Sequence, residues 1–242
     1  MLQGYYSAAS GMSGALQNQD VLAQNLAHAP VPGYRRQGQI FSAFVKPQNA
    51  PASEEQDHPL HGSQVSRIAS VFAPGPYQHT GNPLECAIQG NGFFVLDGPN
   101  GPLYTRNGQF QVNANSQLVS PGGYPVSGAD GALTIPQDAA HLIIGLDGTV
   151  TAGNTTIGQL KLASFADPSQ LERAGTTLFQ APTNVAPQAF TGSIRQGYRE
   201  GSNVQVVQEM VQMIAGMRQY EAAAKSLRSL SDAMQQRING QM

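Results

Sequence analysis

Residues 203–238 read NVQVVQEMVQMIAGMRQYEAAAKSLRSLSDAMQQRI, without a proline and with a single glycine, Gly216. Positions spaced alternately by three and four residues are apolar, apart from one serine: Met210, Met213, Met217, Tyr220, Ala224, Leu227, Ser231, Met234 and Ile238. This spacing is typical of a long helix with one apolar seam, as in a coiled coil. We predict that the helix begins near Asn203, with Ser202 or Asn203 as its N-cap.

The first 28 residues carry the same pattern at the other end of the chain. Their seam positions are apolar or small, apart from one glutamine: Leu2, Tyr5, Ala9, Met12, Leu16, Gln19, Ala23 and Leu26. Pro30 and Pro32 should end this helix, because proline cannot continue the backbone hydrogen bonds. Asp20 is the only charged residue before Arg35. The uncharged outer face suits packing against neighbours on several sides.

The chain between these helices changes character. Short apolar runs, such as those at residues 86–88, 93–96, 117–119, 142–144 and 160–162, alternate with glycine, proline, asparagine and aspartate. The pairs Asn107-Gly108 and Asp147-Gly148 favour β-hairpins. The sequence therefore predicts a β-rich region of short strands.

These patterns predict an α+β chain in which long N- and C-terminal helices pair as a coiled-coil domain around a central β-rich domain. The expected parts are an N-terminal helix and turn over residues 1–45, a polar and proline-rich linker over 46–64, a β-rich outer domain over 65–198 and a C-terminal coiled-coil helix over 199–242.

Composition narrows the classes of function. The 242 residues carry a net charge of −2, and charged residues make up only 12%, so no general attraction to nucleic acid or anionic lipid is expected. No apolar run is long enough to span a membrane. The first residues lack the basic and apolar regions of a secretory signal peptide, so export would follow another route. A low-charge surface favours packing against other subunits.

No enzyme motif is found, and we expect no catalytic residue, cofactor or metal ion. His58 and His61 are better read as solvated loop residues than as metal ligands. The sequence Gly90-Asn91-Gly92 lacks the third glycine of a dinucleotide site and fits a tight turn before a buried strand. Arg35 and Arg36 form a basic spot that is too small for nucleic acid. Cys86, the single cysteine, is expected to be a small buried hydrophobe.

Three separated motif groups resemble the bacterial flagellar axial proteins, which form the rod and hook. They are NLA (25–27) with PGYRR (32–36), then GNPL (81–84), AIQGNGFF (87–94) and YTRNGQF (104–110), then QGY (196–198), EGSNV (200–204) and RQYE (218–221). They occur in the family's order and cover nearly the whole chain. Ala29-Pro30-Val31 departs from the family's serine- or threonine-containing turn, and residues 113–117 lack its usual glycine.

The resemblance implies a structural subunit of the basal-body rod in the periplasm. Its terminal helices would form the inner tube of a helical assembly that transmits torque from motor to hook, with the β domain outside. The implied partners are further copies, other rod and hook proteins, and the flagellar type III export apparatus. The chain length suits the proximal and distal rod proteins better than the hook protein, and we favour the proximal one.

The seams and the motifs together supply the candidate assembly residues: Leu2, Tyr5, Met12, Leu16, Asn25, Leu26, Gly33, Tyr34, Met210, Met213, Met217, Tyr220, Leu227 and Met234. Two alternatives remain from the residues themselves. One is a coiled-coil adaptor that binds a partner without polymerising. The other is a β-rich periplasmic enzyme, which would need a cluster of titratable side chains.

Overall fold

A computed structural model describes residues 2–43, 63–136, 142–153 and 155–239. These residues form two compact units. The helical unit takes its residues from the ranges 1–27, 37–69 and 205–242, and the β unit takes its residues from 28–36 and 70–204. The chain therefore passes between the units four times, after residues 27, 36, 69 and 204.

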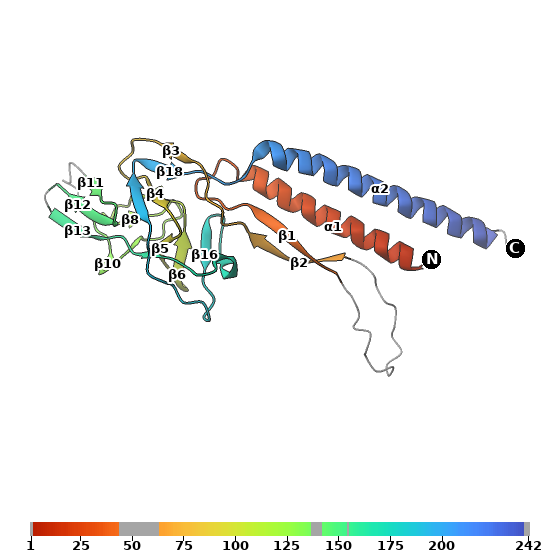
Figure 1. The fold of residues 1–242 in the computed structure, drawn as a ribbon, viewed down its shortest axis with the longest axis horizontal. Helices are drawn as coiled ribbons and strands as arrows, with labels where there is room; N and C mark the ends of the chain where they lie inside the picture. Colours follow the sequence, from red (N-terminus) through yellow and green to blue (C-terminus); the bar gives the residue numbers. More distant parts are fainter. Residues whose placement is uncertain (1, 44–62, 137–141, 154, 240–242) are drawn as a thin grey trace. The chain divides into compact units, whose positions relative to one another are not determined.

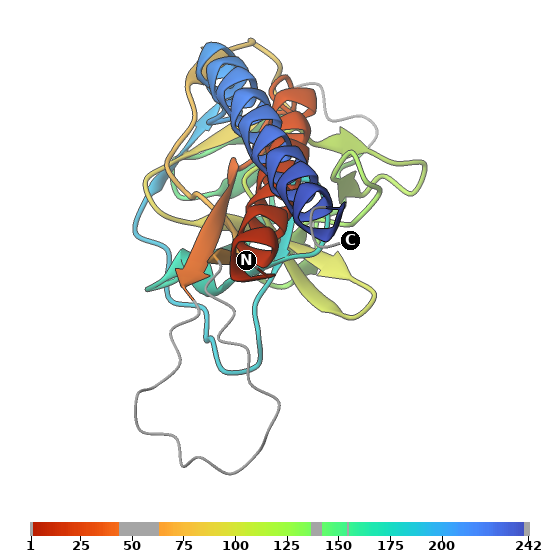
Figure 2. The same cartoon turned by 90° about the vertical axis from the view of Figure 1, so that its right-hand side faces the viewer.

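The helical unit contains helix α1 (Leu2–Ala27), helix α2 (Val206–Asn239) and a two-stranded sheet of β1 (Gln37–Ala43) and β2 (Ser63–Ser70). The helices run side by side in opposite directions, so the start of α1 and the end of α2 lie at the same end of the pair (Figures 1 and 2). Strand β1 contacts α1.

The prediction that this region is a coiled-coil domain of paired helices is wrong. The described residues hold one N-terminal and one C-terminal helix, and the helical unit also includes the β1–β2 sheet. The buried α1 residues Ala15 and Leu22 each lie one position before a predicted seam residue, and Leu16 is 47% exposed.

The same one-residue offset occurs on α2. Glu209 and Gly216 are buried, whereas the predicted seam residues Met210 and Met217 are half exposed. Glu209 and Gly216 therefore interrupt the covered face of α2 among half-buried apolar side chains such as Met213 and Tyr220, which leaves no regular row of apolar knobs for coiled-coil packing. The periodicity predicted two helices but not the face that each one buries, because a glycine or alanine lets another backbone approach closely.

The β unit is built from antiparallel sheets of short strands, as the sequence predicts. The largest has the order β14-β5-β6-β16-β15 (Leu162–Ala163, Phe93–Gly98, Gly101–Thr105, Leu178–Gln180, Glu172–Arg173). A second has the order β11-β12-β13 (Leu142–Ile144, Thr149–Ala152, Thr155–Gln159). Two-stranded pairs are β17-β4 (Ser193–Gln196, Cys86–Gln89), β18-β3 (Tyr198–Glu200, Tyr77–His79), β7-β8 (Gln111–Val112, Leu118–Val119) and β10-β9 (Gly131–Ala132, Ser127–Gly128). A short 3-10 helix covers Pro168–Gln170.

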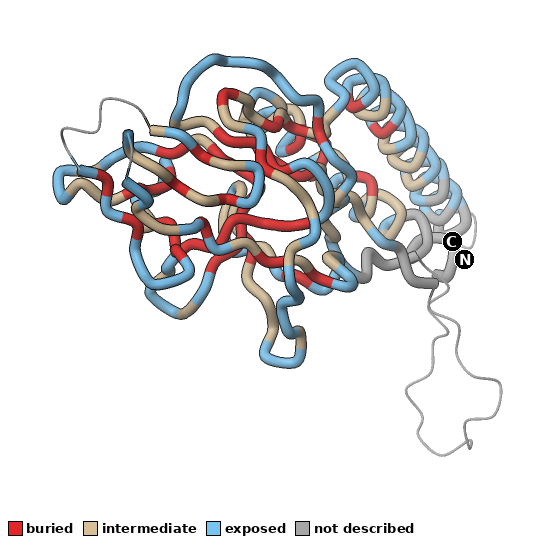
Figure 3. The backbone as a smooth tube through the Cα atoms, turned by 60° about the vertical axis from the view of Figure 1, so that its left-hand side comes forward, coloured by how far each residue is buried: buried red, intermediate tan, exposed pale blue. Residues whose placement is uncertain are grey.

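Two apolar clusters form the core of the β unit, one on each face of β5. Phe94 and Leu96 belong to one cluster, whereas Phe93 and Val95 belong to the other, as the alternation of side chains along a strand requires. Buried backbone is frequent in the β unit, whereas α2 is largely exposed or half-buried (Figure 3). The β unit therefore has a core of its own.

One of the two predicted hairpins is present. Asp147-Gly148 joins the antiparallel strands β11 and β12, and Gly148 has a φ of 88°. The hairpin predicted at Asn107-Gly108 is wrong, because the flanking strands β6 and β7 pair with other strands. The Asn107 side chain instead accepts a hydrogen bond from the Gln109 N–H at 3.1 Å, and the Gly108 carbonyl accepts one from the Cys86 N–H at 2.9 Å.

Some expectations concern residues outside the described ranges. His58 and His61 lie there, as does the predicted linker over residues 46–64 except for residues 63 and 64, which begin β2. The turn predicted before a buried strand is confirmed, since Gly90 has a φ of 105° and β5 begins at Phe93.

Cys86 is fully buried, as predicted, and its burial has a measurable consequence. Desolvation, assisted by the nearby Glu85 carboxylate, raises the pKa of its thiol from 9 to about 12. Above pH 9 the unfolded chain releases this proton while the folded chain keeps it, so stability should fall as the pH rises. The expected slope is at most about 1.4 kcal/mol per pH unit.

Urea unfolding between pH 8 and 10.5 measures this slope. Comparison with Cys86→Ala isolates the thiol, because the remaining titrating groups are common to both proteins. Equal slopes in the two proteins would contradict the prediction.

Candidate functional site

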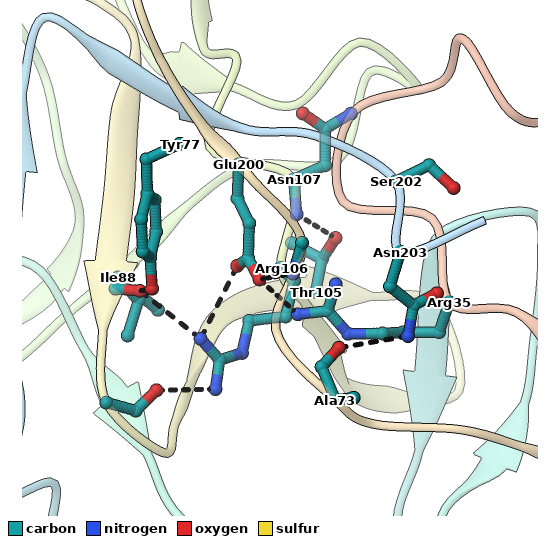
Figure 4. Close-up of polar contacts among 12 residues, drawn as sticks. Arg35, Ala73, Tyr77, Ile88, Thr105, Arg106, Asn107, Glu200, Ser202 and Asn203 are labelled. Carbon is teal, nitrogen blue, oxygen red and sulfur yellow. Dashed lines mark hydrogen bonds and ion pairs between the residues drawn. The ribbon is translucent and has the colours of Figure 1, made fainter. Parts of the chain in front are cut away.

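A buried ion-pair cluster joins three distant parts of the β unit. Glu200 ends β18, Arg106 follows β6, and Arg35 lies in the segment after α1. Glu200 Oε1 accepts a hydrogen bond from Arg35 Nη2 at 2.7 Å, and its Oε2 lies 3.4 Å from Arg106 Nη1 (Figure 4). The Gly75 N–H also donates to Glu200 Oε1 at 3.0 Å. We call Arg35, Arg106 and Glu200 the Glu200 cluster.

The cluster places two guanidinium groups against one carboxylate in a buried environment. Burial lowers the pKa of Arg106, and Glu200 opposes that shift. Arg106 also donates to the carbonyls of Ile88 at 3.4 Å and Gly90 at 2.7 Å. Tyr77 donates its hydroxyl to the Ile88 carbonyl at 2.9 Å, and burial is the main cause of its raised pKa. These groups are held by the protein itself, so the arrangement fixes chain segments in place.

The prediction of a basic spot at Arg35 and Arg36 is wrong. The Arg35 side chain is fully buried, and its charge is paired with Glu200, 165 residues further along the chain. A partner at this distance leaves no local sign in the sequence.

Asn203 is a second connecting side chain of the β unit. Its Oδ1 accepts a hydrogen bond from the Arg36 N–H at 2.6 Å, and its Nδ2 donates to the carbonyls of Val71 at 2.8 Å and Ala73 at 2.9 Å. The prediction that Ser202 or Asn203 caps α2 is wrong, because the helix begins at Val206 and Asn203 uses its side chain here.

Gly33 and Tyr34 lie inside the β unit, beside this cluster. Gly33 has a φ of 72°, and its N–H donates to the Glu200 carbonyl oxygen at 2.9 Å. Tyr34 is buried, with the His28 ring 5.1 Å away between centroids and the Arg173 guanidinium 4.9 Å from the centre of its ring. Both residues hold the segment after α1 against the rest of the β unit.

Asn25 joins three elements of the helical unit. Its side-chain amide exchanges two hydrogen bonds of 2.8 Å with the backbone of Gln37 at the start of β1. It also donates to Glu209 Oε2 on α2 at 3.1 Å. Asn25 and Glu209 are both buried. This pairing fixes the last turn of α1 to β1 and to the first turns of α2.

The first half of α2 presents an exposed apolar surface. Val207, Met210, Val211, Ile214 and Met217 are spaced by three and four residues, so they share one face of the helix. Their exposed fractions run from 46% for Met217 to 76% for Val207. We call these five residues the apolar stripe. Over residues 206–217 the only charged residue is Glu209, and it is buried.

The candidate assembly residues are distributed over both units. Those that are exposed are Leu16, Met210 and Met217; those that are half-buried are Met12, Leu26, Met213, Tyr220 and Leu227; those that are buried are Asn25, Gly33 and Tyr34. Leu2, Tyr5 and Met234 lie on α1 and α2, but their side chains are outside the described part of the structure. Gly33 and Tyr34 lie in the segment after α1, and the remaining candidate assembly residues lie on α1 and α2.

Comparison with known proteins decides the family. The family model "Flagellar hook protein FlgE/F/G D1 domain" matches residues 87–152, and "Flagellar basal body rod FlgEFG protein C-terminal" matches residues 195–240. The flagellar basal-body rod protein FlgG of Agrobacterium fabrum is 34% identical over 90% of this chain and 91% of its own length. The chain belongs to the flagellar basal-body rod protein family.

Other rod proteins agree with this assignment. FlgG of Buchnera aphidicola is 32% identical over 99% of both chains, and FlgF of Caulobacter vibrioides is 33% identical over 86% of this chain and 85% of its own length. The rod subunit is a structural component of the flagellar basal body, involved in motility and not an enzyme, and rod proteins assemble with other axial components. The resemblance seen in the sequence is confirmed.

The matched regions of the rod subunit contain most of the groups that the sequence analysis missed. Arg106 lies in the first region, and Glu200, Asn203 and the stripe residues Val207, Val211 and Ile214 lie in the second. The spacing of Val207, Val211 and Ile214 is itself a signal, because it defines a second apolar face beside the predicted seam. The roles of Glu200 and Arg106 depend on the fold and carried no such signal.

The described residues of the rod subunit show no group of three His, Cys, Asp or Glu side chains arranged to hold a metal ion. Within the described part of the chain, neither α1 nor α2 combines the length and the hydropathy that a membrane-spanning helix needs.

Proposed function

We propose that this rod subunit assembles helically through its terminal helices and that the resulting rod transmits torque from motor to hook. The apolar stripe on α2 carries the proposal, since five large apolar side chains on one helix face are exposed in the single chain. Large contiguous apolar patches on a protein surface mark interaction sites. The β unit, which has its own core, would form the outer layer.

The energetics favour contacts with several neighbours at once. Complete burial of one large apolar side chain contributes about 1.5–3 kcal/mol. Association costs about 4–15 kcal/mol in lost rotational and translational freedom. A half-exposed stripe packed on one neighbour therefore leaves little net affinity, whereas several contacts per subunit add up. A contact between two different surfaces of the subunit produces a helical filament when each copy is also shifted along the axis, so that the ring does not close.

The charge distribution also suits packing between identical subunits. The stripe has no exposed charge within it, because Glu209 points into the helical unit and contacts Asn25. Copies can therefore approach through this face without repulsion between like charges. The outer face of α1, which includes Leu16 and carries one exposed charge, Asp20, offers a second surface with little charge.

Aspartate at Met217 should block incorporation into the rod. A charge buried in a helix interface without a partner costs several kcal/mol, and each 1.4 kcal/mol is a factor of about ten in the association constant. Incorporation should therefore fall by about 100-fold or more, while the free energy of unfolding stays within about 0.5 kcal/mol, as is usual at exposed positions. Electron microscopy of isolated basal bodies and swimming in soft agar measure the result.

Gln219→Asp is the matched control, because Gln219 is exposed on α2 outside the apolar stripe. This variant should assemble and support swimming. Complete rods and normal motility with Met217→Asp would contradict helical assembly through α2. Normal rods together with loss of one binding partner would instead support a non-polymerising adaptor.

We also propose that the subunit reaches a periplasmic rod through the flagellar type III export apparatus, as the family resemblance implies. A subunit blocked in assembly but competent for export should accumulate outside the cell. Immunoblots of the culture medium from the Met217→Asp strain test this step. Retention of the variant in the cytoplasm would contradict it.

A further inference from the structure

The chain crosses between its two units next to segments of the β unit that are hydrogen-bonded to one another. The β-unit segments next to these passages are residues 28–36, 70–76 and 200–204, which we call the crossing segments. The Arg36 carbonyl accepts a hydrogen bond from the Val71 N–H at 2.8 Å, and the Pro76 carbonyl accepts one from the Gly201 N–H at 2.8 Å. Each crossing segment is therefore bonded to another one.

Side chains complete these connections. Asn203, in the last crossing segment, bonds the backbone of Arg36 in the first and of Val71 and Ala73 in the second. Glu200 likewise bonds Arg35 in the first segment and the Gly75 N–H in the second. One asparagine and one glutamate of the last crossing segment thus each contact both of the other segments. Figure 4 shows the bonds of Glu200 to Arg35 and of Asn203 to Ala73.

We propose that Asn203 is a positioning residue for torque transmission, which sets the crossing segments in a common arrangement so that they share the mechanical load. This inference rests on the proposed function, because it concerns how the assembled subunit passes force between its units. Crossing segments that are bonded to one another are loaded at the same time, so each bears part of the force. Crossing segments that can shift independently are loaded one after another, so a single segment can bear the whole force.

The surroundings of Asn203 separate this role from a contribution to stability. Val71 and Ala73 are exposed, so water can replace the bonds that their carbonyls lose when Asn203 is removed. Glu200 is fully buried and its removal would disturb the core. Asn203 is therefore the residue whose loss loosens the crossing segments with little effect on the rest of the β unit.

The test replaces Asn203 with alanine in a strain that lacks the wild-type subunit. Rods should form, and cells should swim normally at low viscosity. Compared with wild type, the rotation rate of tethered cells, or swimming speed in viscous medium, should fall further as load rises. Hydrogen exchange of the purified full chain should show the Arg36 amide exchanging about tenfold faster, since it loses one hydrogen bond, with no change at Phe94 in the core.

Asn113→Ala is the matched control. The Asn113 side chain also makes three hydrogen bonds, to the backbone of Asn115 and of Gln117 and to the Gln117 side chain, away from the crossing segments. This variant should show no dependence on load. Asn203→Asp keeps the acceptor for the Arg36 N–H but loses both donated bonds, so it should give an intermediate effect.

The outcomes are distinguishable from those that test the proposed function. Assembled rods with Met217→Asp would overturn helical assembly through α2, whatever Asn203 does. Wild-type behaviour of Asn203→Ala at every load would overturn the positioning role and leave the assembly proposal standing. An equal loss in Asn113→Ala, or absence of rods in Asn203→Ala, would also overturn it, because the effect would then be one of stability or assembly.

Discussion

Replacement of Glu200 by glutamine is expected to lower the free energy of unfolding of the β unit by about 3–5 kcal/mol. Glutamine has nearly the same shape, so the change removes the charge and leaves the packing. The Arg35 and Arg106 guanidinium groups then remain buried without an anion. Urea unfolding of the full chain, followed by near-ultraviolet circular dichroism of its tyrosines, measures the loss.

Two further variants test the cause of this loss. Glu172→Gln removes a carboxylate from an exposed position and should change stability by less than about 0.5 kcal/mol. Adding Arg106→Met to Glu200→Gln removes one of the unpaired cations and should restore part of the stability. A loss below about 1 kcal/mol for Glu200→Gln would show that the cluster contributes little.

Valine at Gly33 is expected to prevent stable folding of the segment that follows α1. The φ of 72° costs a non-glycine residue about 1–2 kcal/mol, more when it is β-branched. A Cβ at this position would also lie 2.6 Å from the Asn107 Cα and 2.8 Å from the Arg106 carbonyl carbon, both of them backbone atoms. Overpacking of this kind costs about 1–3 kcal/mol more. The unfolding free energy and motility should both fall.

Gly123→Ala and Gly33→Ala separate the two causes. Gly123 has a φ of 81°, and an added Cβ there meets nothing within 4 Å, so its replacement costs only the backbone term. Gly33→Ala should be the more damaging variant by the overpacking term. Equal losses in these two variants would show that Asn107 can move aside. If the segment acts only in assembly, the Gly33→Val subunit should still be secreted.

The sequence alone predicted the helices well and their buried faces badly. Apolar periodicity located α1 and α2 to within about three residues, because three- and four-residue spacing is a local property. It placed Leu16 in the seam where Ala15 is buried, because the choice of face depends on how closely two backbones approach. A periodicity of hydropathy contains no information on that distance.

In the candidate site, too, local features could be predicted from the sequence and contacts between distant residues could not. The motifs around Gly33 and Glu200 supported the family assignment, and the β-rich region followed from its short apolar runs. The pairing of Arg35 with Glu200 could not be predicted, because nothing near either residue identifies a partner 165 positions away. Asn203 was read as a helix cap for a related reason, since capping is the commonest local use of asparagine before a helix.

The Asn25–Glu209 hydrogen bond joins residues 184 positions apart, and this separation governs when the chain can fold. Contacts between remote segments form slowly, because a long loop must close before any of them contributes. The helical unit cannot form until both ends of the chain are available, because α1 and α2 come from opposite ends of the sequence. If subunits assemble through α2 as proposed, an incomplete chain has no finished surface to offer its neighbours, so the folding order would protect against premature polymerisation.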